Sequence, residues 1–388
     1  MPGKTSRAAP RTGKSRSAPK KPVSKFRTGY VALIGRPNAG KSTLLNKILG
    51  QKIAITSDKP QTTRLSILGI HTTPRGQIIF IDNPGLHKPL HKLNKRMMNF
   101  VYASIETADI VCLLVDATAK FGHGDEFALE IIKNVRKPVF LLLNKTDIVR
   151  KEILLPLIDR YRALREFQEF IPLSALKGTN VDVLENLLFD NLPRAEKLYG
   201  DDDVSDQSER FLLAEIIREK ILARVEAELP WTTAVYIDRI DRKRGQEEEE
   251  PEDESGPEEA GGEEAPGERE ALEEPEPERE TGRTIAVPGV SDRPNIRRRG
   301  EKPKPTREER RARPAVYIKA SIFVERPNHR KIIVGRRGQN IKEIGIEARR
   351  EIEEILEARI FLDLQVKVRP QWRDAADVLD LIEGQKEA

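Results

Sequence analysis

Cysteine, long apolar runs and aromatic side chains are scarce in this sequence, and each scarcity excludes a class of protein. Cys112 is the only cysteine among 388 residues, so no disulfide can form within the chain and we expect a reducing, cytoplasmic location. It lies in the apolar run IVCLLVDA, where a small buried hydrophobe is commoner than a nucleophile. No run approaches the roughly 20 apolar residues of a membrane-spanning helix. Aromatic residues make up 5% of the chain, which argues against readers that stack bases on aromatic rings.

Charge is present in quantity but is segregated, so the formal net charge of +5 says little. Residues 1–27 contain nine Lys or Arg and no acidic residue, and we predict a disordered basic tail. This tail either contacts nucleic acid or an acidic membrane surface, or is a solubilising extension. Residues 242–313 are rich in Glu, Pro and Gly and predict a disordered acidic insert, which is either a solvated spacer or a competitor for a basic binding surface of the second domain.

Residues 28–195 alternate short apolar runs with helical stretches, beginning with YVALIG and KSTLLNKIL. Near-continuously apolar strands followed by helices predict a three-layer α/β sandwich with a mostly parallel sheet. The runs LSILGI and QIIFID are separated by a short polar turn instead of a helix, which predicts one antiparallel edge strand.

A second pattern occupies residues 204–241 and 314–372, in the order helix, strand, strand, helix, helix, strand. This order predicts a small α/β domain whose first helix runs to Pro230. The insert then lies at the tip of a hairpin, where added length costs little loop-closure entropy. Residues 373–388 are expected to form a C-terminal tail.

The segment GRPNAGKST follows the first strand and opens a helix, with two glycines, a lysine and a serine at phosphate-loop spacing. Backbone N–H groups and the helix N-terminus can surround the phosphates, while Lys41 reaches the β- and γ-phosphates and the Ser42 hydroxyl binds Mg²⁺. The predicted phosphate-binding residues are Gly35, Arg36, Pro37, Asn38, Ala39, Gly40, Lys41 and Ser42.

Two further segments predict the groups that hold Mg²⁺ and sense the γ-phosphate. DNPG follows the next strand, so Asp82 can hold the metal and Gly85 can offer its N–H to the γ-phosphate. In PQTTR we choose the Thr63 hydroxyl over that of Thr62 as a metal ligand, against the alternative of plain strand-entry threonines. The predicted switch residues are Thr62, Thr63, Asp82, Asn83, Pro84, Gly85 and Leu86, and the predicted Mg²⁺ ligands are Ser42, Thr63 and Asp82.

NKTD, which ends the strand PVFLLLN, predicts that the bound base is guanine. The Asp147 carboxylate can accept two hydrogen bonds from guanine, whereas adenine offers no such donor pair and would leave the carboxylate unpaired. Asn144 is expected to tie the base loop to the phosphate loop, and SAL is expected to offer a backbone N–H to the guanine oxygen. The predicted guanine-binding residues are Asn144, Lys145, Thr146, Asp147, Ser174, Ala175 and Leu176.

The predicted hydrolytic machinery is sparse. Leu86 stands where efficient GTPases often carry a glutamine that orients water, so we expect slow turnover. The Asn38 carbonyl oxygen is placed to hold a monovalent cation, and we hypothesise that K⁺ replaces an arginine finger.

The second domain contains VGRRGQNIKEIG, with a G-x-x-G loop between two helical patterns. Such a loop lets the backbone approach the phosphates of single-stranded RNA, as in KH domains. The predicted RNA-binding residues are Gly335, Arg336, Arg337, Gly338, Lys331 and Lys342, with Arg330 nearby. Ile332, Ile333, Val334 and Ile344 are expected to line an apolar groove for the bases.

Together GRPNAGKST, PQTTR, D-x-PGLH, NKTD, SALKG and VGRRGQNIKEIG resemble the Era family of bacterial GTPases, from Phe26 to Trp372. The resemblance implies a P-loop GTPase domain followed by a type II KH domain, Mg²⁺ as cofactor, and binding of the 3′ end of 16S rRNA. It also implies a role in biogenesis of the 30S subunit and peripheral contact with the inner membrane; we expect a monomer. The family usually has Thr where this chain has Asn83, which puts switch behaviour in doubt.

Two alternatives stay open at this point. A GTPase acting on another RNA, such as transfer RNA, shares similar nucleotide motifs, although no tRNA-modification domain or reactive C-terminal cysteine is evident. A GTP-gated RNA-binding module with negligible catalysis is the other.

Overall fold

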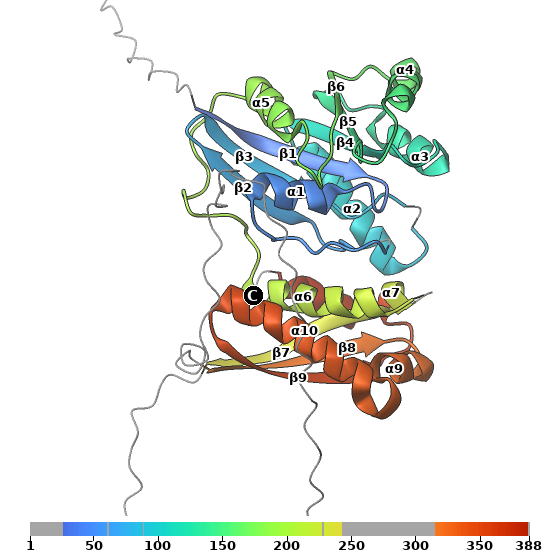
Figure 1. The fold of residues 1–388 in the computed structure, drawn as a ribbon, viewed down its shortest axis with the longest axis vertical. Coiled ribbons are helices and arrows are strands. Elements are labelled where there is room, and N and C mark those ends of the chain that lie inside the picture. The colour runs from blue at the N-terminus through green and yellow to red at the C-terminus, as the bar shows by residue number, and fades with distance from the viewer. Residues whose placement is uncertain (1–25, 60–61, 88, 227–228, 243–314, 387–388) are drawn as a thin grey trace, which may run out of the picture.

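The computed structural model describes residues 26–59, 62–87, 89–226, 229–242 and 315–386. These residues form two domains, one above the other in Figure 1, with helix α6 on the side of the second domain that faces the first. The predicted basic tail and acidic insert lie outside the described residues, except at their boundaries. Arg27 begins the first strand and Arg242 ends the seventh, so both belong to folded elements.

The first domain alternates strands and helices as the sequence predicts. Its elements are β1 (Arg27–Gly35), α1 (Lys41–Leu49), β2 (Ile67–Thr73), β3 (Gly76–Asp82), α2 (Lys92–Thr107), β4 (Ile110–Asp116), α3 (His123–Ile132), β5 (Val139–Asn144), η1 (Lys151–Ile153), α4 (Leu154–Leu164), β6 (Glu169–Pro172) and α5 (Val181–Asn191).

The six strands form one sheet in the order β2-β3-β1-β4-β5-β6. Four of the five strand pairs are parallel, and only β2 and β3 pair in antiparallel fashion, so β2 is the antiparallel edge strand that the short polar turn predicts. Because the carboxyl ends of β1, β3, β4 and β5 lie at one edge, the motifs that follow these strands meet there.

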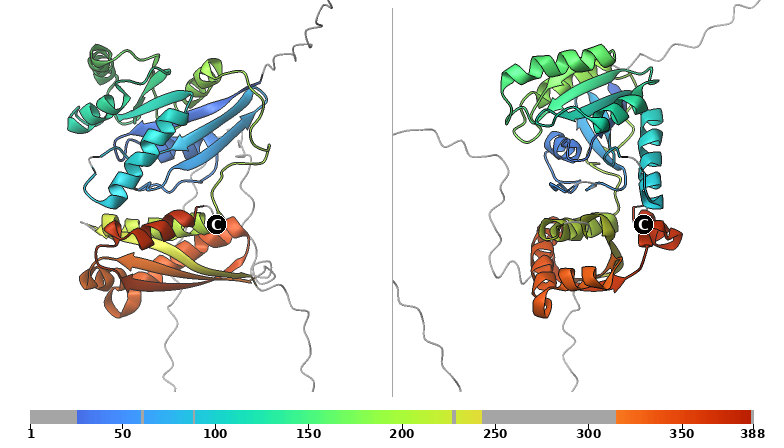
Figure 2. Two further views of the ribbon diagram at one scale, coloured as in Figure 1. Left: turned by 180° about the vertical axis from the view of Figure 1, so that it is seen from behind. Right: turned by 90° about the vertical axis from the view of Figure 1, so that its right-hand side faces the viewer.

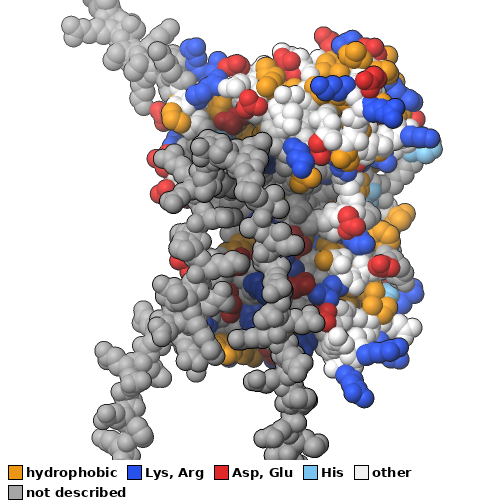
Figure 3. Space-filling view, viewed as in Figure 1, with side chains coloured by type: hydrophobic (Ala, Val, Ile, Leu, Met, Phe, Trp, Pro, Cys, Tyr) orange, Lys and Arg blue, Asp and Glu red, His pale blue; other side chains and the backbone are white. Residues whose placement is uncertain are grey.

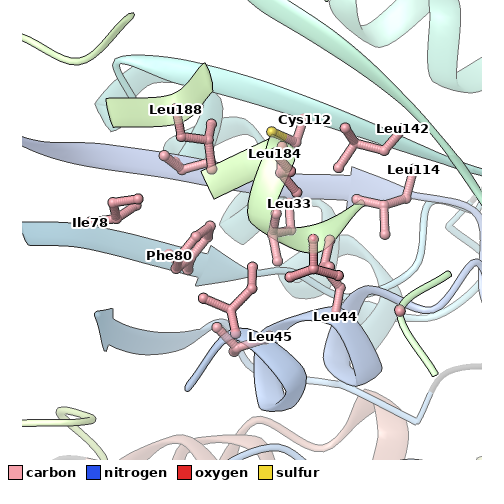
Figure 4. Packing of buried hydrophobic residues seen from close by; sticks show 14 of the residues in the cluster. Leu33, Leu44, Leu45, Ile78, Phe80, Cys112, Leu114, Leu142, Leu184 and Leu188 are labelled. Carbon is pink, nitrogen blue, oxygen red and sulfur yellow. The ribbon is translucent and has the colours of Figure 1, made fainter. Parts of the chain in front are cut away.

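Alternating side chains of the strands enter two separate cores, one on each face of the sheet. Leu33 and Cys112 pack with α1 and α5 on one face, whereas Ile34 and Leu113 pack with α2, α3 and α4 on the other. Figure 4 shows the first core, with the leucines of α1 and α5 pointing at the sheet. Cys112 is fully buried and burial raises the pKa of its thiol, so it is an inert core residue, as its apolar run indicates.

The second domain has the predicted order of elements. They are α6 (Glu209–Arg224), α7 (Leu229–Thr232), β7 (Thr233–Arg242), β8 (Ala315–Val324), α9 (Pro327–Val334), η2 (Arg336–Gly338), α10 (Gln339–Leu356), β9 (Arg359–Val368), η3 (Trp372–Asp374) and α11 (Ala376–Gly384). Its sheet has the order β7-β8-β9, with β7 and β8 antiparallel and β8 and β9 parallel. Helices α6 and α10 cover one face of this sheet and bury its main core.

Two expectations about this domain are wrong in detail. The first helix ends at Arg224 and not at Pro230, because Val225 adopts an extended conformation. Val225 and Leu229 both enter the core, which turns the chain away from the helix axis. Residues 373–384 are not a tail, because they complete η3 and form α11.

Helix α11 packs on the first domain. The sequence pattern of the second domain alone therefore does not predict this helix. Val378 and Leu379 join Leu93 and Met97 of α2 in one buried cluster with Trp372. The carboxylate of Asp374 accepts from the backbone N–H of Lys92 at 2.8 Å and thereby caps α2, whose own N-cap residue makes no side-chain cap bond. Figure 2 shows the end of α2 against α11.

An ionic cluster on another side of the interface also joins the domains. Lys52 of the first domain pairs with Glu219 of α6 and Glu351 of α10, both at 2.6 Å. A cavity of about 800 Å³ lies beside this cluster and contains none of the nucleotide motifs. Among the described residues, no helix has both the length and the apolar character needed to cross a membrane.

Candidate nucleotide site and RNA-binding loop

The phosphate loop connects β1 to α1 and is shaped by a left-handed glycine. Gly40 has φ of 96°, and a β-carbon there would lie 2.2 Å from Nδ2 of Asn144. The loop therefore requires glycine both for its backbone conformation and for the approach of the base-reading segment. The α1 N-terminus that follows carries no side-chain cap, so its first N–H groups are available to an anion.

Lys41 is buried in this loop. Its Nζ donates to the carbonyl oxygens of Gly35 at 3.3 Å and Arg36 at 3.2 Å. Burial lowers the pKa of Lys41, and the nearby Asp82 opposes that shift. An ammonium group held by carbonyls in a site with little water interacts strongly with phosphate oxygens, which is the role predicted for Lys41.

The structure brings the three predicted Mg²⁺ ligands together. Ser42 Oγ donates to Asp82 Oδ2 at 2.6 Å and lies 3.0 Å from Thr63 Oγ1. Asp82 Oδ1 is buried and has no hydrogen-bond partner in the described part of the chain. Burial raises the pKa of Asp82 to about 6, although Lys41, Ser42 and Thr63 act in the opposite direction. Two hydroxyls and a carboxylate with an unused oxygen fit a magnesium ion, which prefers hard oxygen ligands and relieves such desolvation.

Thr62 and Thr63 point to different neighbours, which favours Thr63 as the ligand. Thr63 is buried beside Ser42, whereas Thr62 Oγ1 donates to the carbonyl of Lys59 at 2.7 Å. We call the described residues 56–59 and 62–64 the switch segment, because they form one wall of the site before β2.

Asn83, the departure from the family pattern, is fully buried and joins three strands. Its Nδ2 donates to the carbonyls of Leu33 at 3.3 Å and Ile81 at 3.2 Å, and its Oδ1 accepts from Ser66 at 2.8 Å. A threonine side chain lacks the amide group that makes these bonds. Asn83 is therefore a structural tie between β1, β3 and the start of β2.

Leu86 lies in the apolar core next to the site. Its side chain is 2% exposed, and its backbone N–H donates to the carbonyl of Gly35 at 3.0 Å. Pro84 and Gly85 precede it and are buried, and Gly85 lies against Pro37 of the phosphate loop. An apolar, core-packed residue at this position cannot orient a water molecule, as the sequence indicates.

The base-reading residues converge at the ends of β5 and β6. Asn144 donates to the carbonyl of Ala39 at 2.8 Å and accepts from the N–H of Ala175 at 2.9 Å, which ties the phosphate loop to both base loops. Ser174 Oγ donates to Asp147 Oδ1 at 2.7 Å and orients this exposed carboxylate. The N–H of Ala175 is therefore engaged by Asn144 within the protein.

Lys145 and Thr146 complete this loop. Lys145 has φ of 66° and pairs with Asp116 Oδ2 at 2.6 Å, so its side chain is held at the mouth of the site. The N–H of Thr146 donates to the carbonyl of Leu173 at 3.2 Å. No motif indicates Asp116, which ends β4, although a charged residue at the end of a buried strand is a usable signal.

These segments enclose a cavity of about 200 Å³. It is lined by Pro37, Asn38, Gly40, Lys41, Thr43, Thr56, Ser57, Asp58, Thr62, Thr63, Gly85 and Lys145. Phosphate-loop, switch and base-reading residues therefore share one pocket, and the switch residues 56–58 are additions that no motif indicates.

The G-x-x-G loop lies between α9 and α10 of the second domain. Gly335 has φ of 74°, and a β-carbon there would lie 2.6 Å from that of Asn340. Arg337 has φ of 48° and Gly338 has φ of 77°, so the chain turns sharply in this loop. Arg336 and Arg337 are exposed at its tip.

Basic side chains surround this loop. Arg330, Lys331 and Lys342 are exposed, and Figure 3 shows Lys and Arg side chains over the end of the domain that carries α9. The expectation of a four-residue apolar groove is wrong for Ile333 and Ile344, which are fully buried in the core.

Of the four, Ile332 has 50% of its surface exposed and Val334 is partly buried, so these two are the ones that a base could reach. The helical period explains the error about the groove: adjacent residues of a helix face different directions, so a continuous apolar run cannot all line one surface.

Comparison with known proteins identifies both domains. A model described as a 50S ribosome-binding GTPase matches residues 30–145, and a KH domain model matches residues 307–373. A crystal structure of an Era variant from Aquifex aeolicus with GDP and AlF4⁻ is 33% identical, with a TM-score of 0.70 over 92% of this chain and 99% of that chain. A structure of Era with MgGDPNP and nucleotides 1506–1542 of 16S ribosomal RNA is also 33% identical, with a TM-score of 0.71 over 92% of this chain and 98% of that chain.

These matches extend across both domains and agree with the motifs already placed. The chain is a GTPase with a P-loop α/β domain followed by a KH domain, and it belongs to the Era family.

Proposed function

We propose that this protein binds GTP with Mg²⁺, hydrolyses it slowly, binds the 3′ end of small-subunit rRNA through its KH domain, and assists biogenesis of the 30S subunit. The observation that carries the proposal is the presence, on one chain, of a guanine site and of an exposed basic G-x-x-G loop. The Era complex with a 16S rRNA fragment supports the RNA class, because that relative resembles this chain over both domains.

Different residues of the site bind the phosphates, the base and the magnesium ion. Lys41 and the loop amides bind the phosphates, Asp147 reads the base, and Ser42, Thr63 and Asp82 would hold the magnesium ion. A bound Mg²⁺ supplies positive charge against the β- and γ-phosphate oxygens. Without a residue that orients water, slow hydrolysis follows, and the bound nucleotide then serves chiefly to set conformation.

A monovalent cation is the proposed source of catalytic help. Asn38 has φ of 61° and donates from Nδ2 to the carbonyl of Asp58, which leaves its Oδ1 for a cation at the pocket. We expect that replacing KCl with NaCl lowers the rate constant of GTP hydrolysis about tenfold or more, because charge on the transferring phosphate loses its stabilisation. Phosphate release under single-turnover conditions measures this effect.

An Asn38→Gly variant provides the control for the cation, since glycine keeps the backbone conformation and removes the oxygen. It should hydrolyse GTP at one low rate in both salts. Equal rates of the unaltered protein in KCl and NaCl contradict the cation site.

The proposed function as a whole is tested by crosslinking the full-length protein to total cellular RNA, once with a non-hydrolysable GTP analogue and once with GDP. Sequencing of the crosslinked fragments should show enrichment of the 3′ end of small-subunit rRNA with the GTP analogue. This outcome is expected because the switch segment contacts the KH domain directly.

The other outcomes are distinct. Crosslinking of the same rRNA segment in both nucleotide states supports rRNA binding but contradicts control of that binding by GTP. Enrichment of transfer RNA, or of no RNA, contradicts the role in 30S assembly and means that the GTPase acts on a different partner.

Peripheral contact with the inner membrane, a cytoplasmic location and a monomeric state stay predictions that vesicle flotation, fractionation and sedimentation would test.

A further inference from the structure

Two consecutive residues of helix α6, in the KH domain, hold the two ends of the switch segment of the GTPase domain. Glu219 Oε1 accepts from the backbone N–H of Thr56 at 3.1 Å. Arg218 donates from its guanidinium to the carbonyl oxygen of Thr62, the residue before Thr63. The wall of the nucleotide pocket is therefore fixed at both ends by the other domain.

The residue on the other side of Thr63 is anchored on the same domain. Arg64 donates to the carbonyl oxygens of Thr233 at 2.7 Å and Trp231 at 3.2 Å. Its guanidinium lies over the ring of Trp372, 5.5 Å from the ring centre. Thr63 thus lies between two neighbours that the KH domain holds, and its own hydroxyl points back to Ser42.

The burial of Arg218 shows that its contact is not an incidental surface pair. The side chain is 2% exposed, and Glu215 accepts from its Nε at 2.7 Å. One terminal nitrogen, Nη1, is buried and has no hydrogen-bond partner among the residues described. Glu215 also accepts from the terminal nitrogen that donates to Thr62, so this bidentate pair holds the guanidinium in one orientation against the switch segment.

We propose that Arg218 is a positioning residue for GTP hydrolysis, supplied by the KH domain, which fixes the Thr62 carbonyl so that the Thr63 hydroxyl faces the magnesium site. The GTPase centre is complete only while α6 is docked on the switch segment. Movement of the KH domain then alters hydrolysis through the switch segment, and the Arg218–Thr62 hydrogen bond is the anchor from α6 that lies next to Thr63.

The test uses the full-length protein with the double substitution Arg218→Met/Glu215→Gln, which removes the buried charge together with its partner and so limits the loss of folding stability. We expect kcat to fall about 10- to 100-fold, as for the loss of a residue that orients a metal ligand, and half-saturating Mg²⁺ to rise by a similar factor. GDP affinity should change less than about twofold, because GDP lacks the γ-phosphate that the switch segment senses.

A measurement on the nucleotide-free protein separates positioning from catalysis. Backbone amide hydrogen exchange of residues 62–64 should be about tenfold faster in the double variant, because the hydrogen bond that restrains Thr62 is lost. Arg218→Lys retains a donor without the planar fork, and should recover part of both kcat and exchange protection.

Arg224→Met is the matched control. Arg224 lies on the same helix and pairs with Glu343 and Glu347 of α10, and it does not contact the switch segment. Its variant should retain kcat, the Mg²⁺ requirement and slow exchange. The proposal is overturned if Arg218→Met/Glu215→Gln behaves like this control, or if it loses GDP and GTP affinity equally. Unchanged Mg²⁺ dependence in Thr63→Ala overturns it too, since no ligand would then need positioning.

Discussion

Asp147→Asn is expected to lower the affinity for GTP about 1,000-fold, because two hydrogen bonds from guanine to a charged carboxylate are lost. In the structure, Ser174 Oγ donates to one carboxylate oxygen of Asp147, and the residue is otherwise exposed. An asparagine amide would instead point a donor at the donors of guanine. Isothermal titration with GDP and GTP measures the loss directly.

The same substitution should create affinity for xanthosine nucleotides. Xanthine carries a carbonyl oxygen where guanine carries its amino group, so the asparagine amide can donate to it. Ser174→Ala is the control: it removes the group that orients Asp147 but retains the charge, and should weaken GTP binding by about tenfold only. Undiminished GTP affinity in Asp147→Asn would show that this loop does not read the base.

The nucleotide site could be predicted from the sequence because its motifs are local and each follows a strand. Parallel strands place their carboxyl ends at one edge, so segments far apart in the chain, such as Gly35–Ser42 and Asn144–Asp147, meet without any further information. The sequence is a weaker guide to the choice of Thr63 over Thr62, because the two hydroxyls are adjacent. Only the contact between Thr63 and Ser42 in the structure distinguishes them.

What the sequence could not predict are the contacts between domains. The pattern of α6 shows that this helix has a buried face, but it does not reveal that Arg218 meets Thr62 across the interface. The fold of α11 was missed for the same reason, because its apolar residues pack against Leu93 and Met97 of another domain. Periodicity identifies a surface that is buried and leaves its partner unspecified.

The tip of the G-x-x-G loop gives the second large expected effect. Arg336 and Arg337 are exposed there, and the strained backbone of the loop brings both guanidinium groups and the chain itself within reach of successive phosphates. Arg336→Glu/Arg337→Glu should weaken binding of a single-stranded oligonucleotide from the 3′ end of small-subunit rRNA about 100-fold or more, through the loss of two charged hydrogen bonds. Fluorescence anisotropy across a salt series measures both the affinity and its salt dependence.

The salt series distinguishes loss of phosphate contacts from a general change of charge. Releasing two fewer counterions should reduce the slope of log affinity against log salt by about 1.4 for single-stranded RNA. Lys133→Glu/Arg136→Glu alters the net charge equally on exposed residues beyond α3 of the first domain, and should leave both affinity and slope nearly unchanged. Equal losses in the two double variants would mean that RNA responds to the overall field and not to the loop. A loss confined to the loop variant, with GTP hydrolysis intact, locates the RNA backbone on the tip between α9 and α10, away from the α6 face that holds the switch segment.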